Sequence, residues 1–192
     1  MKVVLQSIRM LVILSIITGI VYPFVMTGLA QALLSRQANG SMVVRDGQPI
    51  GSNLVGQNFS SDKYFWPRPS GVGYSPLPSS GTNLGPTSAV LRDSVAARAA
   101  RLGKPIGEIP ADLLEASGSG LDPHISPEAA EIQVDRVLTA RGFPLSLRNQ
   151  LQTFVKAHIE MPQLGVLGEE RINILQLNMD LDTLRLQPGG LR

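Results

Sequence analysis

The feature that most constrains the fold is a run of 26 residues without a charged side chain, Met10–Ser35, which lies between Arg9 and Arg36. At a rise of about 1.5 Å per residue, a helix of this length is long enough to cross a hydrocarbon core of about 30 Å with some tilt. The sequence therefore predicts a transmembrane helix over residues 10–34.

A cleaved secretory signal is the alternative, because Ala30-Gln31-Ala32 matches an A-x-A cleavage site and basic residues precede the apolar run. The apolar core of a secretory signal is about 7–15 residues long. Here a longer apolar run precedes the supposed cleavage site, so we favour a helix that stays in the membrane.

Polar and small residues recur at every fourth position of this helix: Ser15, Gly19, Pro23, Thr27 and Gln31. Small and hydroxyl-bearing residues allow close approach of a second helix and offer hydrogen bonds across the contact. Pro23 also removes a backbone donor, which predicts a kink. The alternative is that Gly and Pro are simply frequent in membrane helices. We interpret this stripe as a partner-binding face.

Charge next to the helix indicates its orientation. Lys2 and Arg9 precede the span, whereas Arg36 and Arg45 follow it with Asp46 nearby. Because positive residues favour the cytoplasmic side, the sequence predicts a cytoplasmic N-terminus over residues 1–9. Residues 36–192 then form one soluble extracytoplasmic domain, which is long enough for a sizeable core.

Composition excludes several functions for this domain. The formal net charge is +2, and the two basic residues before the helix account for it, so the domain offers no basic patch for nucleic acid. Cysteine is absent, which excludes disulfides, thiolate metal sites and cysteine nucleophiles.

Local patterns predict an α+β domain with a small sheet and about four helices. Asp46-Gly47 between short apolar runs predicts a hairpin, with the strand of Pro49 at an edge. The helices are expected from the N-cap Ser88 to Gly103, over 111–116, from the N-cap Ser126 to Gly142, and from Ser146 through Ile159. Alternation predicts an irregular strand over 171–178, followed by one last turn.

Half of the residues in segment 51–88 are Gly, Pro or Ser, yet the segment also carries five aromatic residues. Disordered linkers are poor in aromatic residues, and a loop of this length without helix or strand is usually functional or disordered. We therefore predict an ordered loop, whose aromatic side chains either fill the core of the domain or face a partner subunit.

Residues that carry catalytic chemistry are few. Ser119, Asp122 and His124 lie close together in the sequence, so a membrane-tethered or exported enzyme, or a binding module, is a rival hypothesis. However, no G-x-S-x-G motif precedes them, and one His with one Asp is too small a ligand set for a metal. We predict no catalytic residue and no metal site.

Glycines and serines of the same loop suggest a phosphate cradle before a helix: Ser117, Gly118, Ser119 and Gly120. Neither phosphate-binding motif, G-x-x-x-x-G-K-[ST] or G-x-G-x-x-G, is present. A tight structural loop is the favoured interpretation, and these four residues are weak candidates for cofactor binding.

Five longer strings carry a resemblance to one family. They are Gly51–Gln57, Tyr64–Ser70, Ser80–Thr87, Ala116–Ser126 and Leu167–Asn178. Together with the chain length and the single N-terminal apolar helix, they resemble the C subunit of bacterial Kdp-type potassium-transporting ATPases. The resemblance spans nearly the whole chain in order.

This resemblance implies a non-catalytic accessory subunit in the bacterial inner (plasma) membrane. In that family, a channel-like subunit selects potassium, which is the cargo, and a P-type ATPase subunit hydrolyses ATP. The C subunit assembles with both and is described as a catalytic chaperone that raises the ATP affinity of the ATPase subunit. The resemblance implies these two subunits and the membrane as partners, and no cofactor held by the chain itself.

Overall fold

The computed structural model describes residues 1–45, 47–184, 186–187 and 190–191, with side chains through residue 184. The chain divides into two compact units, Met1–Ile50 and Gly51–Arg192. Helices outnumber strands, and the strands are short. This confirms the predicted α+β class.

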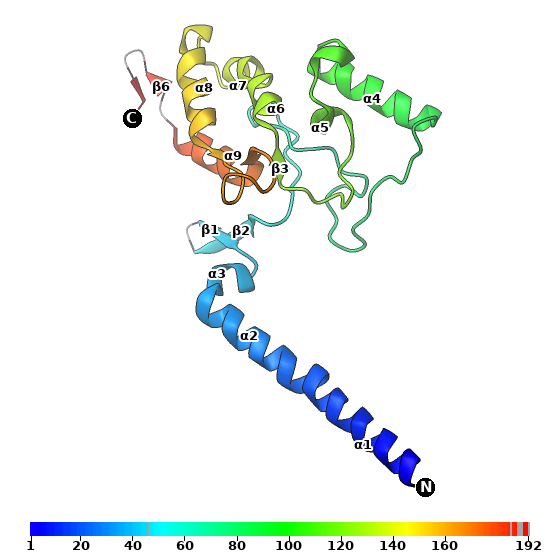
Figure 1. Cartoon of the computed structure of the whole chain (residues 1–192). Helices are drawn as coiled ribbons and strands as arrows, with labels where there is room; N and C mark the ends of the chain where they lie inside the picture. Colours follow the sequence, from blue (N-terminus) through cyan, green and yellow to red (C-terminus); the bar gives the residue numbers. More distant parts are fainter. Residues whose placement is uncertain (46, 185, 188–189, 192) are drawn as a thin grey trace. The chain divides into compact units, whose positions relative to one another are not determined.

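The first unit is dominated by one continuous, strongly apolar helix of 32 residues, Lys2–Leu33. It consists of α1 (Lys2–Ile16), the π-helical turn η1 (Ile17–Val21) and α2 (Tyr22–Leu33) (Figure 1). By length and composition, this helix could cross a membrane. It begins eight residues earlier than the predicted span, because the charged residues Lys2 and Arg9 continue the helical backbone.

Pro23 lies two residues after the end of the π-helical turn, in the first turn of α2. Proline lacks an N–H, and a π-turn is one of the ways in which a helix adjusts to such a break. The N–H of Tyr22 donates to the carbonyl of Ile17, five residues back. The irregularity expected at Pro23 is therefore a widened turn that precedes it.

After the long helix, the chain continues with α3 (Ser35–Ala38) and a hairpin of β1 (Met42–Arg45) and β2 (Gln48–Ser52). The two strands confirm the predicted hairpin. Of its predicted turn, Gly47 adopts a positive φ of 78°, and Asp46 lies outside the described residues.

The helices of the second unit are α4 (Ala89–Leu102), α5 (Ala111–Leu114), α6 (Pro127–Glu131), α7 (Val134–Ala140), α8 (Arg148–Ala157) and α9 (Ile174–Thr183), with 3-10 turns η2 (Ile106–Glu108) and η3 (Leu145–Leu147). Strands β3 (His124–Ile125), β5 (Arg171–Asn173) and β4 (Ile159–Glu160) form an antiparallel sheet in that order. A second pair, β6 (Leu186–Gln187) and β7 (Gly190–Leu191), follows.

Capping signals located two helix starts correctly. The side chain of Ser88 accepts a hydrogen bond from the N–H of Leu91, and α4 ends at Gly103 in the left-handed conformation. The side chain of Ser126 accepts from the N–H of Ala129 at 3.1 Å, with Pro127 at the first helical position. These polar caps satisfy N–H groups that a helix start leaves without partners.

The third predicted helix, up to Gly142, is wrong in one respect, because it is two helices. Between α6 and α7, the N–H of Gln133 donates to the carbonyl of Ala130, three residues back, so the turn tightens. The Gln133 side chain is buried and donates to the carbonyls of Ala129 and Trp66. The break between the two helices therefore coincides with Gln133, a polar residue that makes its hydrogen bonds inside the domain.

Other boundaries also differ from the prediction. The second helix, predicted over 111–116, ends at Leu114. The fourth helix ends at Ala157, and Ile159 instead pairs with Ile172 in the sheet. The strand predicted over 171–178 ends at Asn173, whose side chain caps α9 by accepting from the N–H of Gln176. At its start, the apolar pattern of residues 174–181 fits both the two-residue period of a strand and the 3.6-residue period of a helix. The cap at Asn173 favours the helix.

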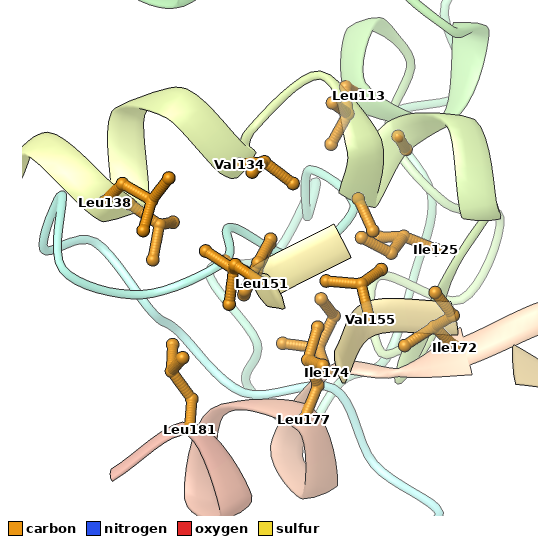
Figure 2. Packing of buried hydrophobic residues seen from close by; sticks show 14 of the residues in the cluster. Leu113, Ile125, Val134, Leu138, Leu151, Val155, Ile172, Ile174, Leu177 and Leu181 are labelled. Carbon is orange, nitrogen blue, oxygen red and sulfur yellow. The ribbon is translucent and has the colours of Figure 1, made fainter. Parts of the chain in front are cut away.

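The core of the second unit lies between α6, α7, α8, α9 and the three-stranded sheet (Figure 2). Its labelled members are Leu113, Ile125, Val134, Leu138, Leu151, Val155, Ile172, Ile174, Leu177 and Leu181. In Figure 1, α4 and α5 lie at one end of this unit and α7 and α8 at the other. The segment 53–88, described throughout, forms no helix or strand, and polar contacts hold it.

Candidate functional site

The predicted partner-binding stripe runs along the long helix of the first unit. None of the residues of α1, η1 and α2 is buried. On a regular α-helix, positions four residues apart drift by roughly 40° per step, so the stripe would turn by about 160° from Ser15 to Gln31. The π-turn adds one residue to a turn, which reduces this drift to about 60°. The wide turn thus keeps the stripe on one side.

Two stripe positions have a defined local environment. Beyond the backbone of its own helix, a Cβ atom at Gly19 would have no neighbouring atom within 4 Å, so a second helix could approach closely there. Gln31 is already engaged, since its side-chain amide exchanges hydrogen bonds with that of Asn39 at 3.1 and 3.4 Å. The partner-binding role of the stripe stays a prediction.

In the second unit, two loops that the sequence singled out come together. Ser70 donates its hydroxyl to the carbonyl of Gly120 at 2.7 Å, and the N–H of Ser117 donates to the carbonyl of Pro69 at 3.0 Å. Gly120 has a φ of 71°, and a Cβ atom there would lie 2.8 Å from the carbonyl oxygen of Ser80. The 117–124 loop is therefore packed tightly against residues 69–80.

The weak cofactor candidates already use several of their polar groups inside this loop. Ser117 is buried. The N–H of Gly120 donates to the Ser117 carbonyl at 3.2 Å, and the Ser119 hydroxyl accepts from the N–H of Leu121 at 3.1 Å. A phosphate cradle needs free N–H groups, so binding at Ser117, Gly118, Ser119 and Gly120 remains only a candidate role.

Asp122 is the centre of a small charged cluster beside this loop. Its carboxylate lies 3.2 Å from Arg68 Nη1 and 3.6 Å from His124 Nδ1, and it accepts from the backbone N–H of His124 at 3.0 Å. Burial alone would raise the pKa of Asp122, but the hydrogen bonds from His124 and Arg68 together outweigh it, so the pKa lies below its usual value. Asp122 is thus held as a carboxylate.

The rival enzyme hypothesis requires Ser119 to meet His124. The structure brings Asp122 and His124 together. In the described part of the chain, no hydrogen bond joins Ser119 to either of them, and the Ser119 hydroxyl is bonded within its own turn. A serine nucleophile needs its base within hydrogen-bond reach, and this arrangement does not provide that contact.

The aromatic loop residues Phe65 and Trp66 are buried. Of the two alternatives for the aromatic side chains of this loop, these two residues therefore follow the first, which is packing inside the domain. Two buried side-chain amides clamp their backbone as a neighbouring strand would. Asn178 accepts from the N–H of Phe65 and donates to its carbonyl, both at 2.9 Å, and Gln133 makes the same pair of contacts with Trp66 at 2.8 and 3.3 Å. These clamps fix the loop on α9 and on the turn before α7.

Sequence analysis missed Gln133 and Asn178. The signal was present, because each is an amide among the apolar positions that face the core. Buried amides are almost always hydrogen-bonded, so their presence could have predicted a backbone segment packed against them.

Two guanidinium groups stack on the Trp66 ring. Arg101 and Arg136 lie 3.6 and 3.7 Å from its centroid, a geometry that favours cation–π attraction. Burial lowers the pKa of Arg136 to about 10. A cavity of about 130 Å³ opens beside this stack and is also lined by Tyr74 and Arg98.

The fold and these contacts define an α+β domain with clamped loops that follows a single apolar N-terminal helix. The family model described as KdpC, the c chain of K+-transporting ATPase, matches residues 4–183. The chain therefore belongs to the KdpC family, which confirms the resemblance carried by its sequence strings.

Curated relatives agree with this assignment. The potassium-transporting ATPase KdpC subunit of Geobacter sulfurreducens is 50% identical over 190 residues, which is 96% of this chain and 99% of the relative. The KdpC subunit of Geotalea uraniireducens is 47% identical with the same coverage. That of Polaromonas naphthalenivorans is 47% identical over 90% of both chains.

Proposed function

We propose that this chain is a non-catalytic accessory subunit of a high-affinity, ATP-driven potassium import complex, needed for assembly and stability of the complex. Membership of the KdpC family supports this role. The observation that carries it is the 32-residue apolar helix, none of whose residues is buried by the rest of the described chain. Such a surface requires lipid or another protein around it.

The long helix anchors the chain in the bacterial inner (plasma) membrane. Lys2 and Arg9 favour a cytoplasmic N-terminus, which puts the C-terminal domain outside the cytoplasm. Because the chain has no cysteine, single cysteines at exposed Lys2 and Lys104 would map both sides. An impermeant thiol reagent added to intact cells should label Lys104→Cys and spare Lys2→Cys. The opposite pattern would reverse the topology.

The partners are a channel-like subunit that selects potassium and a P-type ATPase subunit that hydrolyses ATP. The stripe of Ser15, Gly19, Pro23, Thr27 and Gln31 is the proposed contact within the membrane. A role as catalytic chaperone, raising the ATP affinity of the ATPase subunit, would then require coupling across the membrane, because the domain and the nucleotide lie on opposite sides.

The stripe is tested by co-purification of the pump with a tagged form of this chain. Leu at Gly19 and Thr27 should reduce recovery of the pump strongly, since bulky side chains block close helix approach. The matched control carries Leu at Thr18 and Gly28, the same residue types off the stripe. Normal recovery with Gly19→Leu/Thr27→Leu would contradict the proposed contact.

The enzyme alternative predicts a different outcome. His124→Ala should alter only stability or assembly if the 117–124 loop is structural. Loss of potassium uptake by a complex that still assembles fully would instead favour a chemical role for His124.

A further inference from the structure

Residues 161–168, between β4 and β5, form a tight turn that its own backbone holds together. Gln163 and Leu167 form an antiparallel bridge, in which each N–H donates to the other's carbonyl at 2.9 Å. The N–H of Gly165 donates to the carbonyl of Pro162 at 3.0 Å. We call residues 161–168 the apolar turn, which lies in the orange segment between α8 and α9 in Figure 1.

Four large apolar side chains of this turn are exposed to solvent. The exposed fractions are 66% for Met161, 90% for Leu164, 79% for Val166 and 57% for Leu167. Single exposed apolar residues are ordinary, but a cluster of them indicates an interaction site. Here they make up half of eight consecutive residues.

The backbone at the tip adds an independent observation. Leu164 has a φ of 55°, a left-handed conformation that Gly and Asn adopt far more readily than a branched apolar residue. The turn therefore presents a large apolar side chain against the local backbone preference. Such outliers concentrate at functional positions.

We propose that the apolar turn docks into an apolar cleft with a basic rim on a neighbouring subunit of the same transport complex. This rests on the proposed function of the chain as a subunit. Three exposed glutamates flank the turn, Glu160, Glu169 and Glu170, and Arg171 is paired with Glu160 at 3.1 Å. Acidic flanks complement lysine or arginine at the edge of the cleft.

A lipid surface fits the turn less well. The eight residues include no Lys, Arg, Trp or Tyr, the side chains that hold proteins at membrane interfaces. The flanking glutamates would also be repelled by anionic lipids.

A second copy of this chain fits less well too. Four side chains fall short of the roughly 800 Å² per partner that a stable interface buries. So small a contact is effective only when the partner is already held nearby, because tethering raises its effective concentration. A subunit that also contacts the chain elsewhere meets this condition.

The first test uses the complete complex purified from membranes. Leu164→Asn/Val166→Thr removes two exposed apolar side chains, and Asn suits the left-handed backbone. Leu145→Asn/Val90→Thr is the matched control at exposed positions elsewhere. We expect the complex with the first variant to dissociate in detergent roughly ten times faster, while the control equals wild type. Thermal unfolding of the domain should be unchanged or shifted upward.

The second test places a photoreactive benzoylphenylalanine at Leu164 in the complex. A cross-link to another pump subunit supports the docking. Cross-links only to lipid or to a second copy, or none together with unchanged dissociation, would overturn it. If the wild-type chain failed to co-purify with the pump, the proposed function would fail as well. Normal co-purification without these effects would reject the docking alone.

Discussion

The two units of this chain use apolar residues in opposite ways. The helix Lys2–Leu33 leaves every one of its apolar side chains unburied by the chain itself, whereas α6–α9 and the sheet close over a continuous core. A leucine therefore stabilises the domain directly, but stabilises the helix only through lipid or a partner. Stability of the domain and assembly of the complex should accordingly be separable by mutation.

The largest expected effect tests this difference with one substitution made in both units. Leu138 in α7 is 0% exposed and Leu14 in α1 is 50% exposed. Leu138→Ala should lower the free energy of unfolding by about 3–5 kcal/mol through lost burial and a cavity. Leu14→Ala should change it by less than about 0.5 kcal/mol.

Fluorescence of Trp66 during denaturation can measure both, because it is the only tryptophan and lies in the domain. Equal effects of the two substitutions would show that the helix takes part in the folding of the domain, and would break the comparison.

A smaller effect is expected at the amide clamp. Asn178→Leu keeps the approximate size of the side chain but leaves the buried N–H and carbonyl of Phe65 without partners. We expect a loss of about 2–4 kcal/mol, measured in the same denaturation experiment. Gln176→Leu, on the exposed face of the same helix, is the control. Similar losses of stability from both substitutions would indicate that leucine destabilises helix α9 itself, and that the loss does not come from the clamp.

The charged cluster around Asp122 predicts that the stability of the domain depends on pH. The pKa of Asp122 lies below its ordinary value of 3.8 in the folded domain, so the carboxylate adds stability above about pH 4. This contribution is lost as the pH falls through the folded pKa. Asp122→Ala should cost about 1–2 kcal/mol at pH 7, and the difference from wild type should shrink below pH 4.

Asp93→Ala, on the exposed face of α4, should leave stability at neutral pH within about 0.5 kcal/mol of wild type. A difference between Asp122→Ala and wild type that stayed constant from pH 7 to pH 3 would contradict the role of the Asp122 carboxylate.

How much the sequence could predict depended on the range of the interactions involved. The helix caps Ser88 and Ser126 act within one turn, and both were located correctly. The long helix was also identified correctly, because its apolar run is a local property of consecutive residues. The start of α9 was missed because residues 174–177 fit two periods, and the cap at Asn173 decided between them.

The site was harder to predict because its contacts join distant segments. Gln133 meets Trp66 across 67 positions, and Asn178 meets Phe65 across 113. Each amide could be recognised as out of place on an apolar face, but its partner backbone could not be named. The docking of the 117–124 loop on residues 69–80 is likewise a tertiary contact, which no local pattern encodes.

The smallest predicted effect sharpens the comparison at the helix starts. Helix α6 begins with a side-chain cap from Ser126, whereas α1 begins after Met1 without one. Ser126→Ala should cost about 1 kcal/mol of domain stability, and Ser126→Thr, which keeps the hydroxyl, should cost less. If Ala and Thr at this position were equivalent in denaturation, packing around α6 would hold its first turn without the cap. The domain would then depend on its core even at its helix ends, and the long N-terminal helix, which has neither a core nor a cap, would depend wholly on its surroundings.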